Sequence, residues 1–441
     1  MQNGSAQQPS PVKFTGTMNP AAPTVRWLNI FNILAAGSLI TLLSSCASLK
    51  APKTLFITLG IEEKDFKTDT AQIRSFLDKY TETFQRSNPD VNVVYINYKS
   101  KNFYDQVAKD TSLNLGPDLV ITEQDSAREL FARGLITTLP NQQYFDAIYS
   151  PRTQSVAKTK AGYLFAPWLI TTQLACFNKT KVENPPSTIE ELEELSASGI
   201  RIGLAANINE LIWTAGTQGA IPELSSLGSA MTTHQAYPGI QAWLQWLQRA
   251  ALYQNISFHE SSRELSLKLK NNDLDWIPCW GGIALEDLKK TMGNKLGVTA
   301  LPNGSSSKAL PSHRHYGFSL GKNSSPSQRA MALKFIRTNV NTVAQRKLQL
   351  DDLGFLAANQ NVSIPPESSK NLDAVNTSYN EQASDYTKEW PGILGWLLPE
   401  TRDSKNYWKR YLEINNTFRD LTNGYLSIEE AFKTTITNPT N

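Results

Sequence analysis

The chain has 441 residues, of which 40% are hydrophobic and 19% are charged, and its formal net charge is +3 at pH 7. This near balance argues against a nucleic-acid partner, which would need a basic face. Because the length exceeds what one hydrophobic core usually supports, we expect two lobes.

The first 45 residues are typical of an export signal. Residues 1–25 carry Lys13 as their only charge, and Arg26 precedes a nearly uncharged apolar run over residues 27–43. That run is marginal for a membrane-spanning helix, whereas a short apolar core between a positive charge and small residues characterises a signal peptide. An uncleaved anchor or a buried helix is the alternative. Translation from Met18 instead of Met1 would give a signal of ordinary length, and both starts stay open.

Cys46 follows directly in the stretch Leu-Ser-Ser-Cys. This stretch resembles a bacterial lipobox, in which small residues precede a cysteine that is lipidated and becomes the new N-terminus. The resemblance implies that residues 1–46 form a lipoprotein signal segment. It also implies that the rest of the chain works outside the cytoplasm, in the cell envelope, tethered to a membrane leaflet that the sequence does not identify.

Strands and helices then alternate along the chain. The first strands are expected over residues 54–60, 91–98 and 117–123, and the first helices over residues 73–84, 102–113 and 126–133. This alternation implies parallel β-α-β units with both sheet faces covered, so the fold class is α/β.

The same pattern continues to the end of the chain. Further strands are expected over residues 162–170, 172–178, 201–205, 275–280, 297–301 and 316–320. A helix starts after a cap at Ser187 or Thr188, and others are expected over residues 240–253, 327–340, 404–423 and 427–433. Ser324 or Ser327 is expected to cap the helix over residues 327–340.

Cys176 and Cys279 are the cysteines left after Cys46. They could pair in an oxidising compartment, but we favour two buried small apolar side chains. The His-Arg-His triplet at residues 313–315 is expected to face solvent beside a strand. We expect no metal site and no cofactor.

Several short segments carry a family resemblance, each weak alone but ordered along nearly the whole exported chain. They include Gly-Pro-Asp-Leu-Val-Ile at 116–121, Gly-Tyr-Leu-Phe-Ala-Pro-Trp at 162–168, Pro-Pro-Ser-Thr-Ile-Glu-Glu-Leu at 185–192, Trp-Gly-Gly at 280–282 and Gly-Val-Thr-Ala-Leu-Pro at 297–302. Together they resemble the extracellular solute-binding proteins of ABC transporters, family 1, the maltose- and sugar-binding lipoprotein type. Cys176, where the family usually has an aromatic or aliphatic residue, is a departure that loosens the subfamily assignment.

The resemblance implies a two-lobe periplasmic-binding-protein fold, with two doubly wound sheets joined by a hinge and a ligand cleft between them. The lobes would comprise residues 47–169 with 300–350, and residues 170–299 with 351–441. The implied partners are a small-molecule solute and the membrane subunits of an ABC permease, and we expect a monomer.

Candidate ligand-binding residues follow from chain position and chemistry. Glu123 and Asp125 come after a strand, where a carboxylate of this family accepts hydrogen bonds from sugar hydroxyls; a helix-start acid is the alternative, and Asp125 is preferred. Trp168 and Trp280 suit stacking on a pyranose, and core packing is the alternative. On the late helix, the family often has a stacking aromatic where this chain has Trp408 and Tyr411.

The predicted function is capture of a small polar solute, a carbohydrate or sugar-like osmolyte, for an ABC importer, and no enzyme activity is expected. The alternatives are a polyamine or phosphorylated polyol on the same fold, and a cell-envelope glycan hydrolase. Since acids at positions 123 and 125 lack obvious basic companions in the sequence, neutral or cationic solutes are favoured over anionic ones.

The sequence Ser-x-x-Lys at 305–308 fits one motif of penicillin-interacting serine enzymes, but the chain lacks the other motifs of those enzymes.

Overall fold

The computed structural model describes residues 53–60, 70–98, 102–228, 236–351, 353–363, 371–397 and 404–437. The chain divides into two compact units, residues 1–51 and 52–441, and every described residue belongs to the second. The proposed lipidation residue Cys46 lies outside the described residues. Within them, no helix is both long and apolar enough to cross a membrane.

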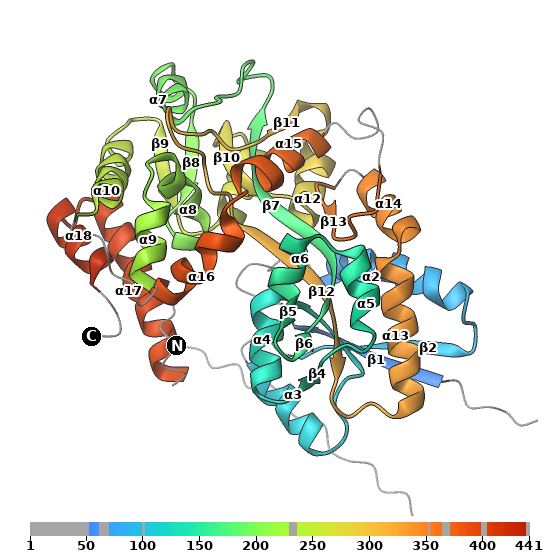
Figure 1. Cartoon of the computed structure of the whole chain (residues 1–441). Helices are drawn as coiled ribbons and strands as arrows, with labels where there is room; N and C mark the ends of the chain where they lie inside the picture. Colours follow the sequence, from blue (N-terminus) through green and yellow to red (C-terminus); the bar gives the residue numbers. More distant parts are fainter. Residues whose placement is uncertain are drawn as a thin grey trace, which may run out of the picture. The chain divides into compact units, whose positions relative to one another are not determined.

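Three parallel strands begin the fold (Figure 1). Strand β1 (Lys53–Gly60) pairs with β2 (Val91–Ile96) on one side and with β3 (Leu119–Glu123) on the other. Three helices alternate with these strands, as the sequence predicts: α2 (Thr70–Arg86), α3 (Phe103–Ser112) and α4 (Gln124–Ala132).

Helices cover both faces of this part of the sheet. Successive side chains of a strand point to opposite faces. Accordingly, Ile121 of β3 belongs to the same core cluster as Phe84 of α2. Its neighbour Val120 packs with Val107 of α3 and Leu130 of α4 in a separate cluster. A sheet buried on both faces in this way is characteristic of α/β proteins.

The strand β7 (Ala166–Asn178) runs through the whole sheet, and all 13 of its residues are buried. It pairs antiparallel with β12 (His313–Gly321) over its first half, and with β10 (Trp276–Trp280) and β11 (Leu296–Thr299) over its second half. The path of strands is β2-β1-β3-β12-β7-β10-β8-β9, in which β8 comprises Ile202–Ala205 and β9 comprises Ile256–His259.

The sequence predicts two separate strands over residues 162–170 and 172–178, and the break between them is wrong. Only Gly162–Tyr163 forms a separate short strand, β6, and β7 is continuous from Ala166. Strand β7 is continuous because one pairing partner follows another without a gap. Strand β12 pairs with β7 as far as Thr172, and the pairing with β10 begins at Gln173.

Beyond β10 the sheet continues with the parallel strands β8 (Ile202–Ala205) and β9 (Ile256–His259). One face is covered by α7 (Ile189–Ala197), α8 (Ile208–Thr217) and α10 (Pro238–Ala251), and the other by α11 (Ser262–Lys270) and α12 (Ile283–Met292). The fully buried Trp276 of β10 packs on the first of these faces.

The chain then returns to the first strands. Helix α13 (Pro326–Val340) packs on β1, β7 and β12, and α14 (Thr342–Leu350) precedes the short strand β13 (Leu356–Ala357), which pairs with β7. The last helices lie mainly against the second part of the fold: α15 (Leu372–Asn376), η4 (Thr377–Gln382), α16 (Tyr386–Leu397), α17 (Ser404–Thr422) and α18 (Ile428–Ile436).

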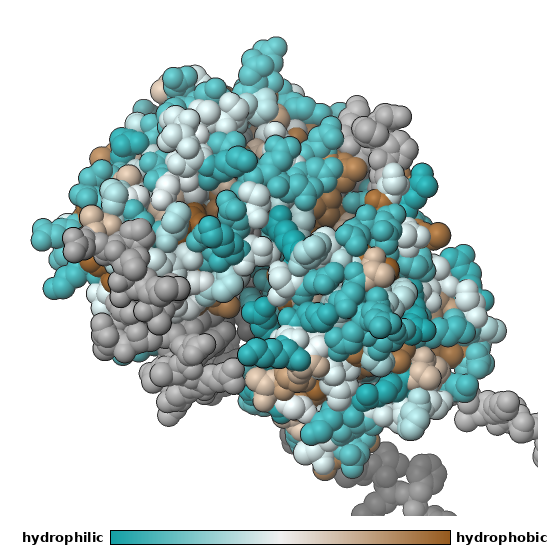
Figure 2. All heavy atoms as spheres, viewed as in Figure 1, coloured by the Kyte–Doolittle hydropathy of each residue, from teal (hydrophilic) through white to brown (hydrophobic). Residues whose placement is uncertain are grey.

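Shorter elements complete the described chain: β4 (Ile136–Thr137), α5 (Gln142–Ile148), α6 (Pro151–Ala157), β5 (Lys158–Thr159), α9 (Ile221–Gly228) and η2 (Gly293–Lys295). The predicted boundary after residue 169 falls inside β7, and those after residues 299 and 350 fall at the ends of β11 and α14. On the coloured part of the face in Figure 2, apolar side chains appear in small separate groups among hydrophilic ones.

Local capping explains where two predicted helices start. Thr188 caps α7, since its hydroxyl accepts from the amide of Glu191 at 3.2 Å. For α13 the sequence suggests Ser324 or Ser327 as the cap. The structure instead uses Ser325, in a reciprocal capping box with Gln328. Proline at the first helical position, directly after Ser325, fits this start because its missing N–H is not needed there.

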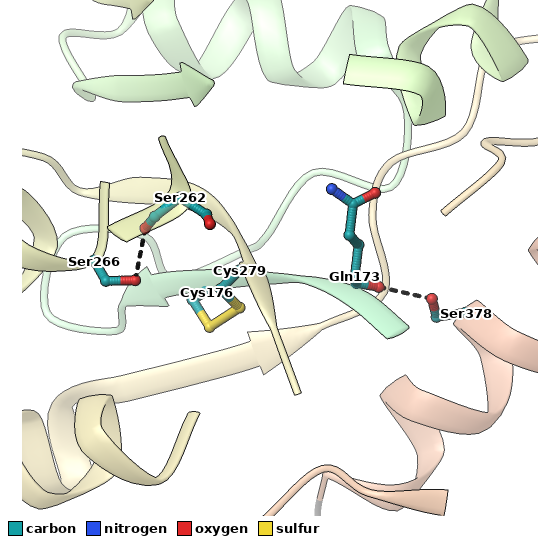
Figure 3. Close-up of a disulfide and its surroundings, with 6 residues drawn as sticks. All are labelled: Gln173, Cys176, Ser262, Ser266, Cys279 and Ser378. Atoms are coloured by element: carbon teal, nitrogen blue, oxygen red, sulfur yellow. Dashed lines mark hydrogen bonds between the residues drawn. A yellow bond between two sulfur atoms is a disulfide. The ribbon is translucent and has the colours of Figure 1, made fainter. Parts of the chain in front are cut away.

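Cys176 and Cys279 form a disulfide (Figure 3), which corrects the expectation of two unpaired buried thiols. In the antiparallel pair of β7 and β10, Cys176 is opposite Ile277 and Cys279 is opposite Leu174, so the two cysteines are diagonal neighbours on one face. Their Cα atoms are 5.8 Å apart, within the range that a disulfide spans. The bond links residues 103 positions apart, a proximity that only the sheet creates.

The expectation that the His-Arg-His triplet faces solvent is also wrong. His313 and His315 are 1% and 0% exposed, because β12 is an inner strand between β3 and β7. Tyr379 of η4 covers them, with its ring centroid 5.0 Å from that of His313 and its hydroxyl 3.0 Å from Nε2 of His315.

Candidate functional site

The carboxyl ends of three strands, β3, β8 and β10, converge on the middle of β7. Arg314 of β12 is opposite Thr171 of β7, and Trp280 of β10 is opposite Gln173. Since Thr171 and Gln173 are two residues apart on one strand, these four side chains lie on the same face of the sheet. Ligands of open α/β sheets bind beyond the carboxyl ends of strands, which makes this face the candidate site.

Trp280 is fixed at its polar edge. Its Nε1 donates to both carboxylate oxygens of Glu210, at 3.0 and 3.1 Å. The guanidinium carbon of Arg314 lies 4.6 Å from the centroid of the indole ring. The side chain is only partly buried, so the sequence-predicted stacking residue lies at a surface with its orientation already set.

The two glycines after Trp280 permit a close backbone approach. A Cβ atom on Gly281 would lie 2.3 Å from the carbonyl oxygen of Gly354. Gly282 has a φ of 88°, and a Cβ there would meet the ring of Phe355 at 2.5 Å. Glycine avoids both conflicts, which keeps the end of β10 against the segment before β13.

Glu210 anchors a polar network behind Trp280. It lies in the first turn of α8, where a negative charge is favoured by the helix dipole, and is only 5% exposed. The amide nitrogen of Gln173 donates to it at 3.0 Å, while the amide oxygen of Gln173 accepts from the backbone N–H of Ser312 at 3.0 Å. Because a buried carboxylate needs such donors, Gln173 and Trp280 together stabilise its charge.

Tyr411 of α17 lies at the outer end of this network. Its hydroxyl oxygen accepts from the side-chain amide of Asn209 at 3.1 Å. The backbone carbonyl of Asn209 in turn accepts from the hydroxyl of Ser312 at 2.8 Å. Trp408 belongs to the same helix, but its side chain lies outside the described residues.

The two predicted carboxylates lie where β3 passes into α4. Glu123 is the last residue of β3 and opposite Tyr316 of β12, while Asp125 belongs to the first turn of α4. Burial raises the pKa of Asp125, and the positive charges of Arg128 and Arg314 oppose that rise. The sequence-based statement that these acids lack basic companions is therefore wrong, because the charges of Arg128 in the same helix and of Arg314 in the distant strand β12 both act on Asp125.

Trp168 lies away from this group. It is 2% exposed and its ring packs against Phe76, Tyr80 and Phe318, with centroids 5.6, 4.8 and 5.1 Å away. This is the core-packing alternative, and we leave Trp168 out of the site. The structure thus brings Asp125 and Trp280 into one group through Arg314, and connects Tyr411 to it through Asn209.

The opposite face of the sheet binds helix η4. The hydroxyl of Ser378 donates to the carbonyl of Gln173 at 2.7 Å (Figure 3) and lies 2.8 Å from that of Thr172. Arg152 of α6 stacks on Tyr379 at 3.8 Å and donates to the carbonyl of Ala383 at 2.6 Å. Helix η4 therefore joins α6, β7 and β12 directly behind the candidate site.

Burial also dominates the titration of the two histidines on that face. Burial, with a smaller contribution from the nearby Arg152, lowers the pKa of His315 to about 3. Burial lowers the pKa of His313 well below its ordinary value, with His315 and Arg152 adding to the effect. Both imidazoles are therefore neutral at pH 7.

Sequence reasoning missed Glu210, Gln173 and Arg314. The first turn of α8 reads as an ordinary capped helix, and Gln173 lies in an apolar strand. Arg314 lies in the triplet that the sequence suggested was exposed. Of these three residues, Glu210 could have been found from its position, since it follows the end of a strand as Asp125 does.

Two other chemistries find no support among the described residues. No group of three or more His, Cys, Asp or Glu side chains is arranged to hold a metal ion there. The Ser-x-x-Lys of residues 305–308 forms a loop instead of opening a buried helix, as the serine-enzyme motif requires. In that loop Ser305 donates to Glu190 at 2.8 Å.

Solved structures share this fold. The maltose-maltodextrin binding protein of Alicyclobacillus acidocaldarius aligns over 88% of this chain and 100% of its own, with a TM-score of 0.66 and 14% identity. The GacH receptor of Streptomyces glaucescens, solved unliganded and with acarbose, aligns over 87% and 96%, with a TM-score of 0.61 and 14% identity. Maltose-bound MalE3 of T. maritima aligns over 88% and 99%, with a TM-score of 0.60 and 17% identity.

The two-lobe periplasmic-binding-protein architecture predicted from the sequence is thereby confirmed. A search of curated protein sequences finds no match. The sequence profile of the bacterial extracellular solute-binding proteins matches residues 67–338, which is more than half of the chain. The chain therefore belongs to the family of bacterial extracellular solute-binding proteins.

Proposed function

We propose that this protein captures a carbohydrate or sugar-like osmolyte and delivers it to an ABC importer. The observation that carries the proposal is Trp280, an oriented and partly exposed indole whose N–H donates to the carboxylate of Glu210. An indole face packs well on the apolar face of a pyranose. Carboxylates and amides accept and donate the hydrogen bonds that sugar hydroxyls need, since polar groups buried on binding must stay paired.

The ligands named for the structural relatives support the same class of solute. The compared structures include complexes with maltose, with acarbose and with α-D-tagatose. All three are neutral or weakly basic polyhydroxylated rings. At identities of 14 to 17%, these relatives support a carbohydrate ligand without identifying which one.

Capture would proceed by closure of the two parts of the sheet around the solute. The candidate site draws Asp125 from α4 on one side of β7 and Glu210 from α8 on the other. A solute bound to both would favour the closed arrangement by its extra contacts there, and the importer would recognise that arrangement. Strand β7 is the natural axis, because it belongs to both parts.

A lipid on Cys46 would hold the protein at the membrane beside its importer, as the lipobox resemblance implies. Capture and tethering are separate in this proposal, because Cys46 precedes the compact unit that carries the site. Replacing Cys46 with Ala should release the protein from membranes and leave solute affinity unchanged. Loss of affinity together with release would mean that the anchor also shapes the site.

A thermal-shift screen of the chain from residue 47 onward tests the proposed ligand class. Maltose, acarbose, D-tagatose, spermidine, glycerol phosphate and a cell-wall glycan would be compared. A ligand that binds only the folded state raises the unfolding midpoint in a concentration-dependent way. We expect shifts with neutral sugars. Shifts with spermidine or glycerol phosphate alone would reject the carbohydrate, and cleavage of the glycan without a shift would reject transport.

A further inference from the structure

Arg314 takes a position that resembles that of a bound cation. Its guanidinium lies over the face of Trp280, 4.6 Å from the ring centroid. Its positive charge also acts on the carboxyl group of Asp125, in the first turn of α4. An aromatic face together with a carboxylate is the arrangement by which proteins recognise cationic ligands.

The register of the sheet fixes this position. Arg314 is opposite Thr171, and Trp280 is opposite Gln173, so the two side chains emerge on the same face, two residues apart along β7. The next residue of β12 on that face, Tyr316, is opposite Glu123 at the end of β3. Arg314 therefore lies between the start of α4, with Asp125, and the end of β10, with Trp280.

Arg314 also separates two acidic groups. Asp125 lies in the first turn of α4, beyond the end of β3, which pairs with β12 on one side, and Glu210 accepts from the indole N–H of Trp280 on the other side. Without the guanidinium, the indole face that it covers would lose this positive charge, whereas the carboxylates of Asp125 and Glu210 would remain. Such a surface attracts amines, whereas with Arg314 present an incoming amine meets a positive charge in the place it would occupy.

We propose that Arg314 is a specificity-determining residue that acts as a built-in cation and excludes cationic solutes from this site. The inference rests on the proposed function for the location of the site, and it deepens that function by restricting the solutes to uncharged ones. A neutral sugar ring can stack beside or displace the guanidinium without charge repulsion. A polyamine that stacked beside the guanidinium would be repelled by its positive charge.

The test compares spermidine and ethylguanidine binding by calorimetry to the full-length chain in detergent and to three variants. Arg314→Ala and Arg314→Gln remove the charge, and Arg314→Lys keeps it. Arg337→Ala is the matched control, because Arg337 stacks on Tyr144 at 5.5 Å and lies outside the candidate site. Melting curves of each variant verify that it is folded.

We expect Arg314→Ala and Arg314→Gln to bind spermidine and ethylguanidine at least tenfold more tightly than the wild type. Arg314→Lys and Arg337→Ala should behave like the wild type. Equal amine binding by the wild type and Arg314→Gln, or no amine binding by either charge-removing variant, would overturn the inference. Its failure is distinguishable from failure of the proposed function, which is judged by sugar binding to the wild type alone.

Discussion

Trp280 combines two roles in one side chain. Its N–H satisfies the buried carboxylate of Glu210, and its ring supplies the apolar surface of the candidate site. Replacing Trp280 with Ala should therefore weaken sugar binding by about 1–3 kcal/mol, through loss of stacking area. Isothermal titration with the sugar found in the thermal-shift screen measures the change. Unchanged affinity with lowered stability would assign Trp280 to the core.

Trp168 provides the matched comparison. Its ring is enclosed by Phe76, Tyr80 and Phe318, so Trp168→Phe should leave a cavity and lower the free energy of unfolding by about 1–3 kcal/mol. Sugar affinity should stay the same. Urea denaturation and titration of the same preparation separate the two effects, and a loss of affinity without a loss of stability would return Trp168 to the site.

The buried histidines predict a dependence of stability on pH. His315 has a folded-state pKa of about 3, and the pKa of His313 is also well below its ordinary value. In the unfolded chain both take up a proton near pH 6.5. Stability from these groups is thus fully present above about pH 6.5 and falls as pH decreases toward 3. Each histidine contributes a slope of about 1.4 kcal/mol per pH unit within that window.

Urea unfolding at a series of pH values between 7 and 4 measures this slope. The variant His315→Gln keeps a side chain able to bond the hydroxyl of Tyr379 but does not titrate. The slope of its unfolding free energy against pH should be smaller than that of the wild type by about 1.4 kcal/mol per pH unit, which corresponds to one proton. Equal slopes for the two proteins would mean that His315 is already charged in the folded state.

At the scale of elements, the disulfide between β7 and β10 closes a loop of 103 residues. Chain-entropy arguments give about 4.7 kcal/mol for a loop of this length, and native disulfides typically contribute 2–5 kcal/mol. The double variant Cys176→Ala, Cys279→Ala should lose a free energy of this size. Guanidinium unfolding measures it, with wild type unfolded in excess reductant as the control; a loss below about 1 kcal/mol would show that the bond hardly constrains the unfolded chain.

Strand β7 shows why elements were predicted better than their connections. Its composition indicates extended structure, and both halves were predicted as strands. Its continuity depends on β12 and β10 supplying successive partners, and those strands lie about a hundred or more residues further along the chain. The local sequence of a strand does not indicate which strands it pairs with, because its partners are set by the tertiary fold.

For the whole molecule, the sequence predicts the α/β class, the two-lobe architecture and the family, because these depend on alternation and on motifs spread over the chain. Asp125 and Trp280 could be predicted as candidate site residues because Asp125 follows the end of β3 and Trp280 is the last residue of β10. Arg314 and Gln173 could not, since each lies inside a buried strand and reaches the site only through sheet register. The disulfide escaped prediction for the same reason.

The central claim is that a sugar binds on Trp280 between the carboxyl ends of β3, β8 and β10. The most direct measurement is a crystal structure of the protein with the sugar that gives the largest thermal shift. We predict a sugar ring in contact with the indole of Trp280, at about 4 Å, with hydroxyls bonded to Asp125 or Glu210. A sugar bound elsewhere, with Trp280 still covered by Arg314, would contradict the claim.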